Sequence, residues 1–353
     1  MRGGRVAAGL GALLLVAGCG NQARSDGGPV PARLCVPGTL DAQGSSAQRN
    51  AMDLWRADYQ RSCPGATVNY DPSGSGTGIR AFLAGTIDLV GTDSPLKAME
   101  QAQADARCSG GKAVSLPMVV GPVAVAYRLG GVAELRLSPA TLAKVFGGAI
   151  RRWDDPAIRA DNPGVALPPT RVRAVHRQDS SGTTETFTSF LTARAGPDWP
   201  FGSGRDWRAP DGTGAAGSER VASAVHHTEG AIGYLELSYA RPRGLAVAAV
   251  RTGADRFVVP SGEAAVRSVQ VPSSGLAVRV DPTPTDPAAY PIVLITSEVV
   301  CDRGRSADKT ALMKGFLGYA ASEDGQRSIA RQGYGALPEE LRIRVRAAVD
   351  GLG

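Results

Sequence analysis

The stretch ATVNYDPSGSGTGIRAFLAGTIDLVGTDSPL, residues 66–96, indicates the fold class of this chain. Ala66–Tyr70 and Thr86–Thr92 are short runs typical of strands, and between them Ile79–Gly85 has the apolar spacing of the first turns of a helix. A strand, a helix and a second strand in this order form a βαβ unit. The stretch therefore predicts an α/β protein with mainly parallel sheets.

The rest of the chain continues this alternation and is long enough for two domains. Val119–Tyr127 is apolar and β-branched, which predicts a buried strand, and Thr310–Ala321 and Glu339–Val349 carry apolar residues at helical spacing. Residues 251–287 predict no clear element. Of the 353 residues, 43% are hydrophobic and 20% charged, which indicates a globular core and excludes a chain disordered throughout.

Three turns of small hydroxyl residues and glycine stand immediately before helical patterns. They are Gly44–Gln48, Ser73–Gly78 and Asp179–Thr184. A helix N-terminus presents free N–H groups and the positive end of its dipole, so three such turns are suited to holding a small anion. Each turn by itself is adequately explained by ordinary N-capping. None continues into Gly-Lys-Ser/Thr, so none is a Walker nucleotide-binding loop.

The N-terminus indicates export from the cytoplasm. Arg2 and Arg5 precede an apolar run, Val6–Val16, which ends in small residues. The run has about 11 residues, against the roughly 20 that a membrane-spanning helix needs. A charged start followed by a short apolar run predicts a secretory signal; a first core helix is the alternative.

The segment Val16–Cys19 resembles a bacterial lipobox, whose cysteine is lipidated and becomes the first residue of the mature protein. That resemblance implies removal of residues 1–18 and a lipid anchor on Cys19; an ordinary cleaved signal is the alternative. Residues 19–32 are polar, with Gly, Pro and Ser, and predict a flexible tether between the anchor and the folded body.

The four cysteines after Cys19 predict two disulfides, because an even number in an exported protein is typical of paired thiols. They are Cys35, Cys63, Cys108 and Cys301. Three connectivities are possible. Cys35 and Cys63 each precede a predicted strand near the N-terminus, so we favour Cys35–Cys63 and Cys108–Cys301. Four free, buried thiols are the alternative.

Composition also limits cofactors and partners. Three histidines and five cysteines leave little material for a zinc or iron centre, so we expect no metal and no cofactor. The formal net charge of +6 is mild for 353 residues and indicates no nucleic-acid partner.

The segments Ser75–Ile79, Ala84–Asp88 and Gly91–Leu96 resemble the phosphate-binding subunit of bacterial phosphate ABC transporters. Further similar segments follow in the same order: Leu116–Val125, Phe146–Ile150, Trp153–Pro156, Asn162–Gly164, Leu167–Pro168, Arg177–Thr183, Gly230–Tyr234 and Tyr290–Ile292. The resemblance runs from about Gly44 to the C-terminus and is weakest over residues 251–287.

The resemblance implies a two-lobed type II periplasmic-binding-protein fold. Each lobe is then a mainly parallel sheet flanked by helices, with a hinge between the lobes. We expect lobe 1 to comprise residues 33–120 and 288–353, and lobe 2 residues 121–287. The implied function is extracytoplasmic binding of inorganic phosphate by a monomer that delivers it to a membrane permease.

The resemblance also assigns the phosphate contacts. By position they fall on Ser46, Ala47, Ser75, Asp93, Arg177, Ser181, Gly182 and Thr183. Ala47 stands where the family has phenylalanine, so only a backbone N–H contact is expected there. Asp179 matches the carboxylate that holds the arginine in place.

These residue types suit phosphate better than sulfate. Near neutral pH phosphate retains at least one O–H, whereas sulfate has none, and the ionised Asp93 carboxylate can only accept hydrogen bonds. One obligatory hydrogen bond of this kind can discriminate by about 10⁴- to 10⁵-fold. Arg177 adds a rigid bidentate donor. Without the resemblance, Asp93 would be interpreted as a turn-capping aspartate.

Two other functions remain as alternatives. A secreted phosphatase or esterase would use Ser181 as nucleophile and His176 or Asp179 as base, although the sequence there is not a Gly-x-Ser-x-Gly elbow. A receptor for another oxyanion is the second alternative, and Asp93 argues against sulfate. His226 and His227 have no partner that the sequence identifies.

Overall fold

The computed structural model describes Met1 and residues 30–353. The predicted signal peptide, Cys19 and most of the predicted tether therefore lie outside the described residues. The last residues assigned to the tether are packed against the body: the Val30 side chain is buried and its N–H donates to Ser62 Oγ. A short 3₁₀ turn, η1 (Ala32–Leu34), follows at once. Within the described part, we find no helix with the length and apolarity to cross a bilayer.

One twisted nine-stranded sheet runs through both lobes, in the order β2-β1-β3-β14-β4-β8-β6-β7, with β9 also paired to β4. The lobes meet along β4 (Ala113–Tyr127), whose first part pairs with β14 and whose end pairs with β8. Because β4 is covered on both faces, its sequence is a nearly continuous apolar run. The expected boundary between residues 120 and 121 falls inside this single strand.

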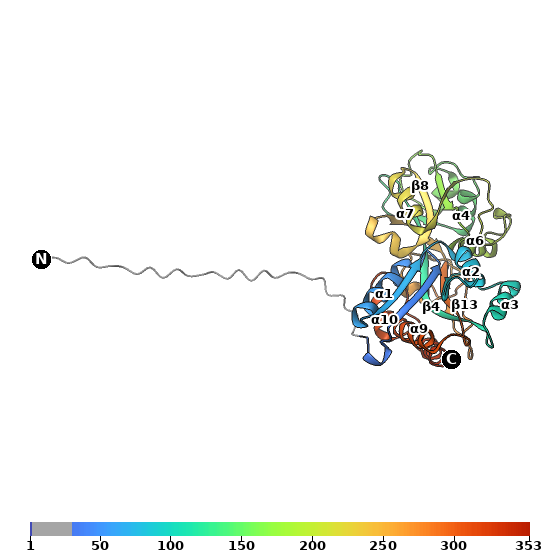
Figure 1. Ribbon diagram of the computed structural model, residues 1–353. Coiled ribbons are helices and arrows are strands. Elements are labelled where there is room, and N and C mark those ends of the chain that lie inside the picture. Colours follow the sequence, from blue (N-terminus) through green and yellow to red (C-terminus); the bar gives the residue numbers. More distant parts are fainter. Residues whose placement is uncertain (2–29) are drawn as a thin grey trace.

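Lobe 1, the lower body in Figure 1, is built from residues 30–120 together with the C-terminal part of the chain. Its strands are β1 (Gly38–Gly44), β2 (Ala66–Asp71), β3 (Leu89–Thr92) and β14 (Val293–Cys301). Its helices are α1 (Arg49–Ser62), α2 (Ser75–Leu83), α3 (Ala98–Arg107), α9 (Ala307–Ala320), α10 (Glu323–Ala330) and α11 (Glu339–Asp350). Strands β2 and β3 both pair in parallel with β1, as the βαβ pattern predicts, and β14 runs antiparallel between β3 and β4.

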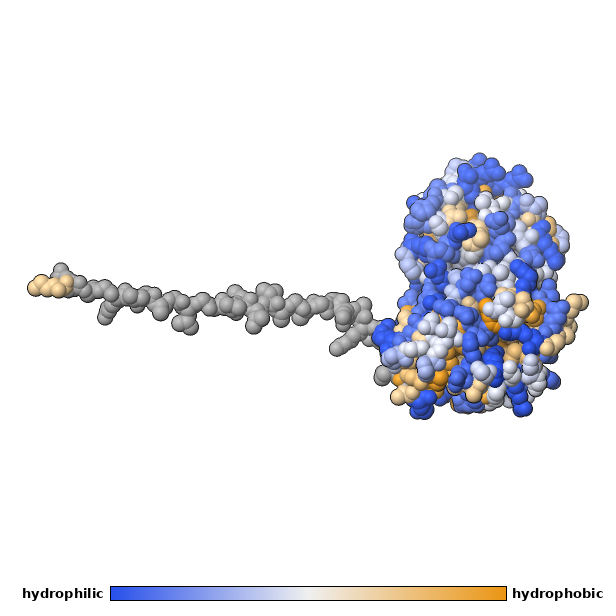
Figure 2. Space-filling model, in the orientation of Figure 1, coloured by the Kyte–Doolittle hydropathy of each residue, from blue (hydrophilic) through white to orange (hydrophobic). Residues whose placement is uncertain are grey.

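Lobe 2 is the upper body in Figure 1. Its strands are β6 (Arg173–Arg177), β7 (Thr213–Ala215), β8 (Ala231–Glu236) and β9 (Ala246–Val247). Its helices are α4 (Pro139–Phe146), α5 (Pro156–Asp161), α6 (Gly182–Ala195) and α7 (Gly217–His227), with 3₁₀ turns η2 (Gly196–Asp198), η3 (Leu237–Tyr239) and η4 (Arg241–Arg243). On the face shown in Figure 2, apolar residues are more common over lobe 1 than over lobe 2.

The region that gave no sequence signal forms small elements. A three-stranded sheet contains β5 (Arg136–Leu137), β10 (Ala249–Arg251) and β11 (Phe257–Val258), followed by α8 (Gly262–Val266) and the pair β12 (Val269–Gln270) and β13 (Arg279–Val280). Helix α8 and the β12–β13 pair pack on lobe 1, although the expected lobe 2 extends to residue 287. Gly262 lies against the Tyr334 backbone, and Arg344 of α11 donates to the Pro272 carbonyl oxygen at 2.7 Å.

Two element boundaries differ from the sequence prediction for identifiable reasons. Helix α2 begins at Ser75 rather than Ile79, because Gly74 adopts a φ of 101° and the glycine-rich turn itself forms the first helical turn. Strand β3 begins at Leu89 rather than Thr86, because the Thr86 N–H and hydroxyl both donate to the Ala81 carbonyl at the end of α2.

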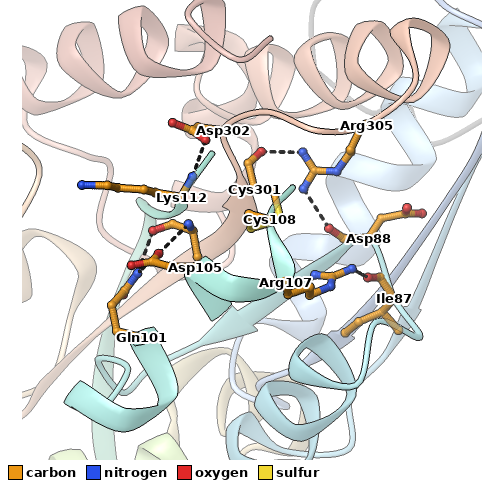
Figure 3. Close-up of a disulfide and its surroundings, with 11 residues drawn as sticks. Ile87, Asp88, Gln101, Asp105, Arg107, Cys108, Lys112, Cys301, Asp302 and Arg305 are labelled. Atoms are coloured by element: carbon orange, nitrogen blue, oxygen red, sulfur yellow. Dashed lines mark hydrogen bonds between the residues drawn. A yellow bond between two sulfur atoms is a disulfide. The ribbon is translucent and has the colours of Figure 1, made fainter. Parts of the chain in front are cut away.

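Both disulfides have the favoured connectivity, Cys35–Cys63 and Cys108–Cys301. The second joins the end of α3 to the end of β14, across 193 residues of sequence (Figure 3). A cross-link over so long a loop removes much of the entropy of the unfolded chain. It fixes the C-terminal segment on lobe 1.

Candidate functional site

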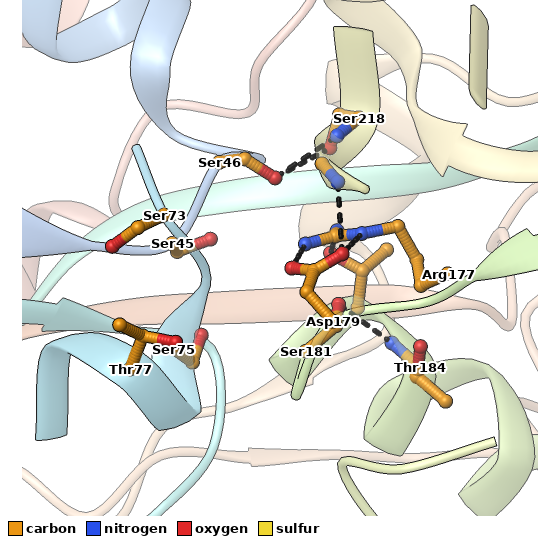
Figure 4. Close-up of polar contacts among 12 residues, drawn as sticks. Ser45, Ser46, Ser73, Ser75, Thr77, Arg177, Asp179, Ser181, Thr184 and Ser218 are labelled. Carbon is orange, nitrogen blue, oxygen red and sulfur yellow. Dashed lines mark hydrogen bonds and ion pairs between the residues drawn. The ribbon is translucent and has the colours of Figure 1, made fainter. Parts of the chain in front are cut away.

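The three predicted turns meet at the carboxyl ends of the parallel strands. Strand β1 leads to Ser45 and Ser46, β2 leads to Ser75, and β6 ends at Arg177. Open α/β sheets bind ligands at this edge because the loops and helix N-termini that follow the strands converge there. In Figure 4 the hydroxyls of Ser45 and Ser46 face Arg177 and Asp179 across the junction between the lobes.

Asp93, the residue after β3, is buried at this junction. Its carboxylate accepts hydrogen bonds from Ser45 Oγ at 2.7 Å and from Thr296 Oγ1 at 2.7 Å, both within lobe 1. A longer one, 3.3 Å, comes from Thr183 Oγ1 of lobe 2. Burial raises the pKa of Asp93, and the hydroxyl donors together with the Arg177 charge act in the opposite direction. Asp93 is thus an acceptor surrounded by neutral donors.

Arg177 is 1% exposed and lies against Asp179, as expected. Its Nε donates to Asp179 Oδ1 at 2.8 Å, and its Nη2 is paired with Oδ2 of the same carboxylate. The Gly217 N–H at the start of α7 also donates to Asp179 Oδ1, at 2.8 Å. Burial tends to raise the pKa of Asp179, but its bonds and charge interaction with Arg177 outweigh burial and lower the pKa. The pair brings one cation and one anion to the site.

The first turn presents its hydroxyls and N–H groups to the same place. Ser46 Oγ lies 3.2 Å from Ser218 Oγ and accepts from Ser218 N at 3.0 Å, which joins the two lobes. The Ala47 N–H donates to Ser45 Oγ at 3.1 Å. With no side chain beyond Cβ, Ala47 can take part only through its backbone, and its carbonyl oxygen accepts from the Tyr334 hydroxyl at 2.8 Å.

The second and third turns touch across the junction. Ser181 caps α6 by accepting from the Thr184 N–H at 3.2 Å, and Ser75 Oγ accepts from the Asp93 N–H at 3.3 Å. A Cβ built on Gly182 would lie 2.6 Å from Asp93 Cβ and 2.8 Å from Ser75 Oγ. Only glycine permits this approach, so the N-terminus of α6 packs directly against Asp93. All eight residues assigned from the sequence are therefore gathered at one junction.

Comparison with known proteins decides the family. The model of a protein family described as "PBP superfamily domain" matches residues 29–324 of this chain. Phosphate-binding protein PstS 3 of Mycobacterium leprae is 37% identical over 96% of this chain and 95% of its own length. Phosphate-binding protein PstS 3 of Mycobacterium tuberculosis is 36% identical over 97% of this chain and 96% of its own length.

The chain belongs to the PstS family of phosphate-binding proteins. Its members are named as binding proteins, and this chain is a binding protein rather than an enzyme. Among solved structures, the phosphate-binding protein from Stenotrophomonas maltophilia superposes with a TM-score of 0.68 over 88% of this chain and 93% of that one, at 22% identity. This likeness confirms the two-lobed fold.

The PstS fold places several polar residues at the site that the sequence analysis did not assign. Ser45 belongs to the first predicted turn, Gly44–Gln48, but the sequence analysis assigned the phosphate contact of that turn to Ser46. Gly217 and Ser218 follow β7 and start α7, which is a fourth small-residue turn before a helix, so the same signal was available in the sequence. Thr296 lies within β14, and nothing in its local sequence distinguishes it.

Among the residues that the structure describes, the two bases that the hydrolase alternative names for Ser181 are both engaged with other partners. The His176 ring stacks on Trp207 with centroids 4.9 Å apart, and its Nδ1 lies 3.0 Å from the Arg177 carbonyl oxygen. Asp179 is bound to Arg177. His226 and His227 contact each other on the last turn of α7, which begins but does not end at the site.

Proposed function

We propose that this chain binds inorganic phosphate between its two lobes and delivers it to the permease of an ABC transporter. The observation that carries the proposal is the convergence of α1, α2 and α6 N-termini on Asp93 and the Arg177–Asp179 pair. The curated relatives, named as phosphate-binding proteins over nearly the whole chain length, support the same ligand.

The eight proposed ligand groups divide into donors and one acceptor. N–H groups at the helix N-termini, the hydroxyls of Ser46, Ser75, Ser181 and Thr183, and the Arg177 guanidinium donate to phosphate oxygens. Asp93 accepts from the phosphate O–H. Sulfate has no proton to give, so it would set an oxygen lone pair against a buried carboxylate.

The site holds its anion with little net charge. Asp179 offsets Arg177, and Asp93 adds a negative charge, so attraction depends on dipoles and hydrogen bonds. Preorganised dipoles in a site shielded from water act strongly because the local dielectric is low. Phosphate bound to groups from both lobes would favour the closed arrangement, which the permease would then recognise.

The remaining parts of the proposal concern location and partners. We propose that residues 1–18 are removed, that Cys19 carries a lipid anchor on the outer face of the membrane, and that residues up to about 30 form the tether. The folded body acts as a monomer. Labelling with a radioactive fatty acid, in the native chain and in Cys19→Ala, tests the anchor; equal labelling would contradict it.

Titration calorimetry on protein stripped of bound phosphate tests the ligand. We expect a dissociation constant of about 1 µM or tighter for phosphate, roughly −8 kcal/mol, and sulfate binding weaker by at least about 10³-fold. Asp350→Asn, an exposed carboxylate at the end of α11, is the matched control for changes at Asp93 and should leave both constants unchanged. Equal affinity for the two anions would overturn the proposal.

A further inference from the structure

Arg205 of lobe 2 makes a set of contacts to lobe 1 that neither the family assignment nor the anion site accounts for. It lies between η2 and β7, and its side chain is 6% exposed. Its Nη1 donates to Glu100 Oε1 at 2.5 Å and its Nη2 to Glu100 Oε2 at 2.8 Å. Glu100 belongs to the first turn of α3 in lobe 1. The two residues form a bidentate ion pair across the junction between the lobes.

On the lobe 1 side, the guanidinium also reaches the turn that follows Asp93. Arg205 Nη2 donates to the Pro95 carbonyl oxygen at 2.9 Å. Glu100 is itself fixed, because Glu100 Oε2 accepts from the Lys97 N–H at 2.8 Å as part of a capping box. The hydrogen bond from Arg205 lowers the pKa of Glu100, so the carboxylate is ionised at neutral pH.

On the lobe 2 side, the same residue supports the turn that begins α6. The Arg205 carbonyl oxygen accepts from the Ser181 N–H at 2.8 Å, and Arg205 Nε lies 3.5 Å from Glu185 Oε2 in the first turn of α6. The adjacent Gly204 N–H donates to Thr188 Oγ1 in the same helix, at 3.2 Å. Arg205 thus contacts the Ser181 turn through its backbone and the Asp93–Pro95 turn through its side chain.

We propose that Arg205 is a positioning residue that couples closure of the lobes to the geometry of the anion site and so slows release of the anion. Separating the lobes must break both hydrogen bonds to Glu100 and the one to Pro95. The Arg205 side chain is 6% exposed and that of Glu100 21%, so removing Glu100 leaves a poorly solvated guanidinium in the closed form, unlike the loss of an exposed ion pair. Breaking a shielded charge pair acts mainly on the dissociation rate.

This inference rests on the proposed phosphate function, and its test separates the two. Stopped-flow release of phosphate is measured for the native chain, Glu100→Gln, Arg205→Gln and the double variant, with calorimetry beside it. We expect Glu100→Gln to speed release about tenfold or more with little change in the association rate. The double variant should speed release by less than the two single variants combined, because each single variant already removes the same Arg205–Glu100 interaction. Arg205→Lys, which keeps the charge and one donor, should restore part of the effect.

Arg243→Gln is the matched control, because Arg243 pairs with Glu219 inside lobe 2 and should leave release unchanged. Small-angle scattering on phosphate-free protein gives a readout independent of the ligand: Glu100→Gln should shift the radius of gyration toward a more open form. If the native chain binds phosphate but Glu100→Gln alters neither release nor scattering, the positioning role is overturned and the phosphate function stands. If the native chain binds no phosphate, the phosphate function fails, and scattering alone decides the role of Arg205.

Discussion

Two groups of buried carboxyls lie close together in this molecule, and their hydrogen-bond partners differ. At the anion site, Asp93 accepts three hydroxyl hydrogen bonds and Asp179 is paired with Arg177. Behind the site, Glu298 of β14 and Glu236 of β8 are fully buried. Neither Glu298 oxygen meets hydrogen-bond geometry with a described group. Glu236 Oε1 also has no partner among the described residues, while its Oε2 accepts from the Ser238 N–H at 2.9 Å and from the Ser238 hydroxyl.

The pKa values of these four carboxyls follow their partners. Burial raises the pKa of Glu298 to about 7, with the Gln48 amide acting in the opposite direction, and burial raises the pKa of Glu236 to about 8. Burial also raises the pKa of Asp93, in spite of its three hydroxyl donors, whereas Arg177 lowers the pKa of Asp179. The difference teaches that a charged partner, more than neutral donors, offsets the cost of burying an ionised carboxylate.

The largest effect should come from Arg177→Ala, which converts Asp179 from a paired carboxylate into an unpaired one. We expect phosphate affinity to fall by at least about 10³-fold, because the bidentate donor is lost. The free energy of unfolding should fall by about 3 kcal/mol, since an uncompensated buried charge remains. Calorimetry and urea unfolding measure the two. A variant that keeps both near the native values would show that the pair is not needed.

Asp93→Asn should have the next largest effect and should alter selectivity more than stability. An asparagine amide can donate to sulfate, so the ratio of phosphate to sulfate affinity should fall by at least about tenfold. Competition calorimetry with both anions measures the ratio, beside the Asp350→Asn control. An unchanged ratio would remove Asp93 from the selectivity mechanism.

Glu298→Gln tests the unpartnered group through pH. The folded-state pKa of about 7 lies above the ordinary 4.5, so the folded protein holds this proton more tightly. The resulting stabilisation is complete below about pH 4.5 and is lost as the pH rises through 7, by up to about 3 kcal/mol. We therefore expect the melting temperature of the native chain to fall between pH 5 and 8 and that of Glu298→Gln to fall less. Parallel pH profiles would show that Glu298 is ionised in the fold.

Thr296→Val should give the smallest effect, because it removes one of the three donors to Asp93 and leaves the other two. The expected loss of stability is about 1 kcal/mol. Losing this donor should raise the pKa of Asp93 further. As the solution is acidified, phosphate binding should therefore begin to weaken at a higher pH in Thr296→Val than in the native chain. The pH dependence of binding measures this, and an unchanged profile would mean that Ser45 and Thr183 suffice.

The sequence predicted the longer elements of the fold well. The strand and helix between Ala66 and Leu83, the buried strand within β4 and the C-terminal helices lie where the patterns placed them. Periodicity and turn chemistry are local properties, so they can be recognised without coordinates. The short elements between Arg251 and Pro287 were missed, because strands of two residues carry no periodic signal.

The sequence by itself therefore determined the fold class and the three anion-suited turns, and the family resemblance proposed eight residues for the anion site. Only the tertiary structure decided which groups meet. Thr296 is separated from Asp93 by 203 residues and Arg205 from Glu100 by 105, yet each pair is in hydrogen-bond contact. Such contacts depend on strand order in the sheet and on the approach of the two lobes, which no local pattern encodes. The same approach brings Thr183 of lobe 2 onto Asp93 of lobe 1.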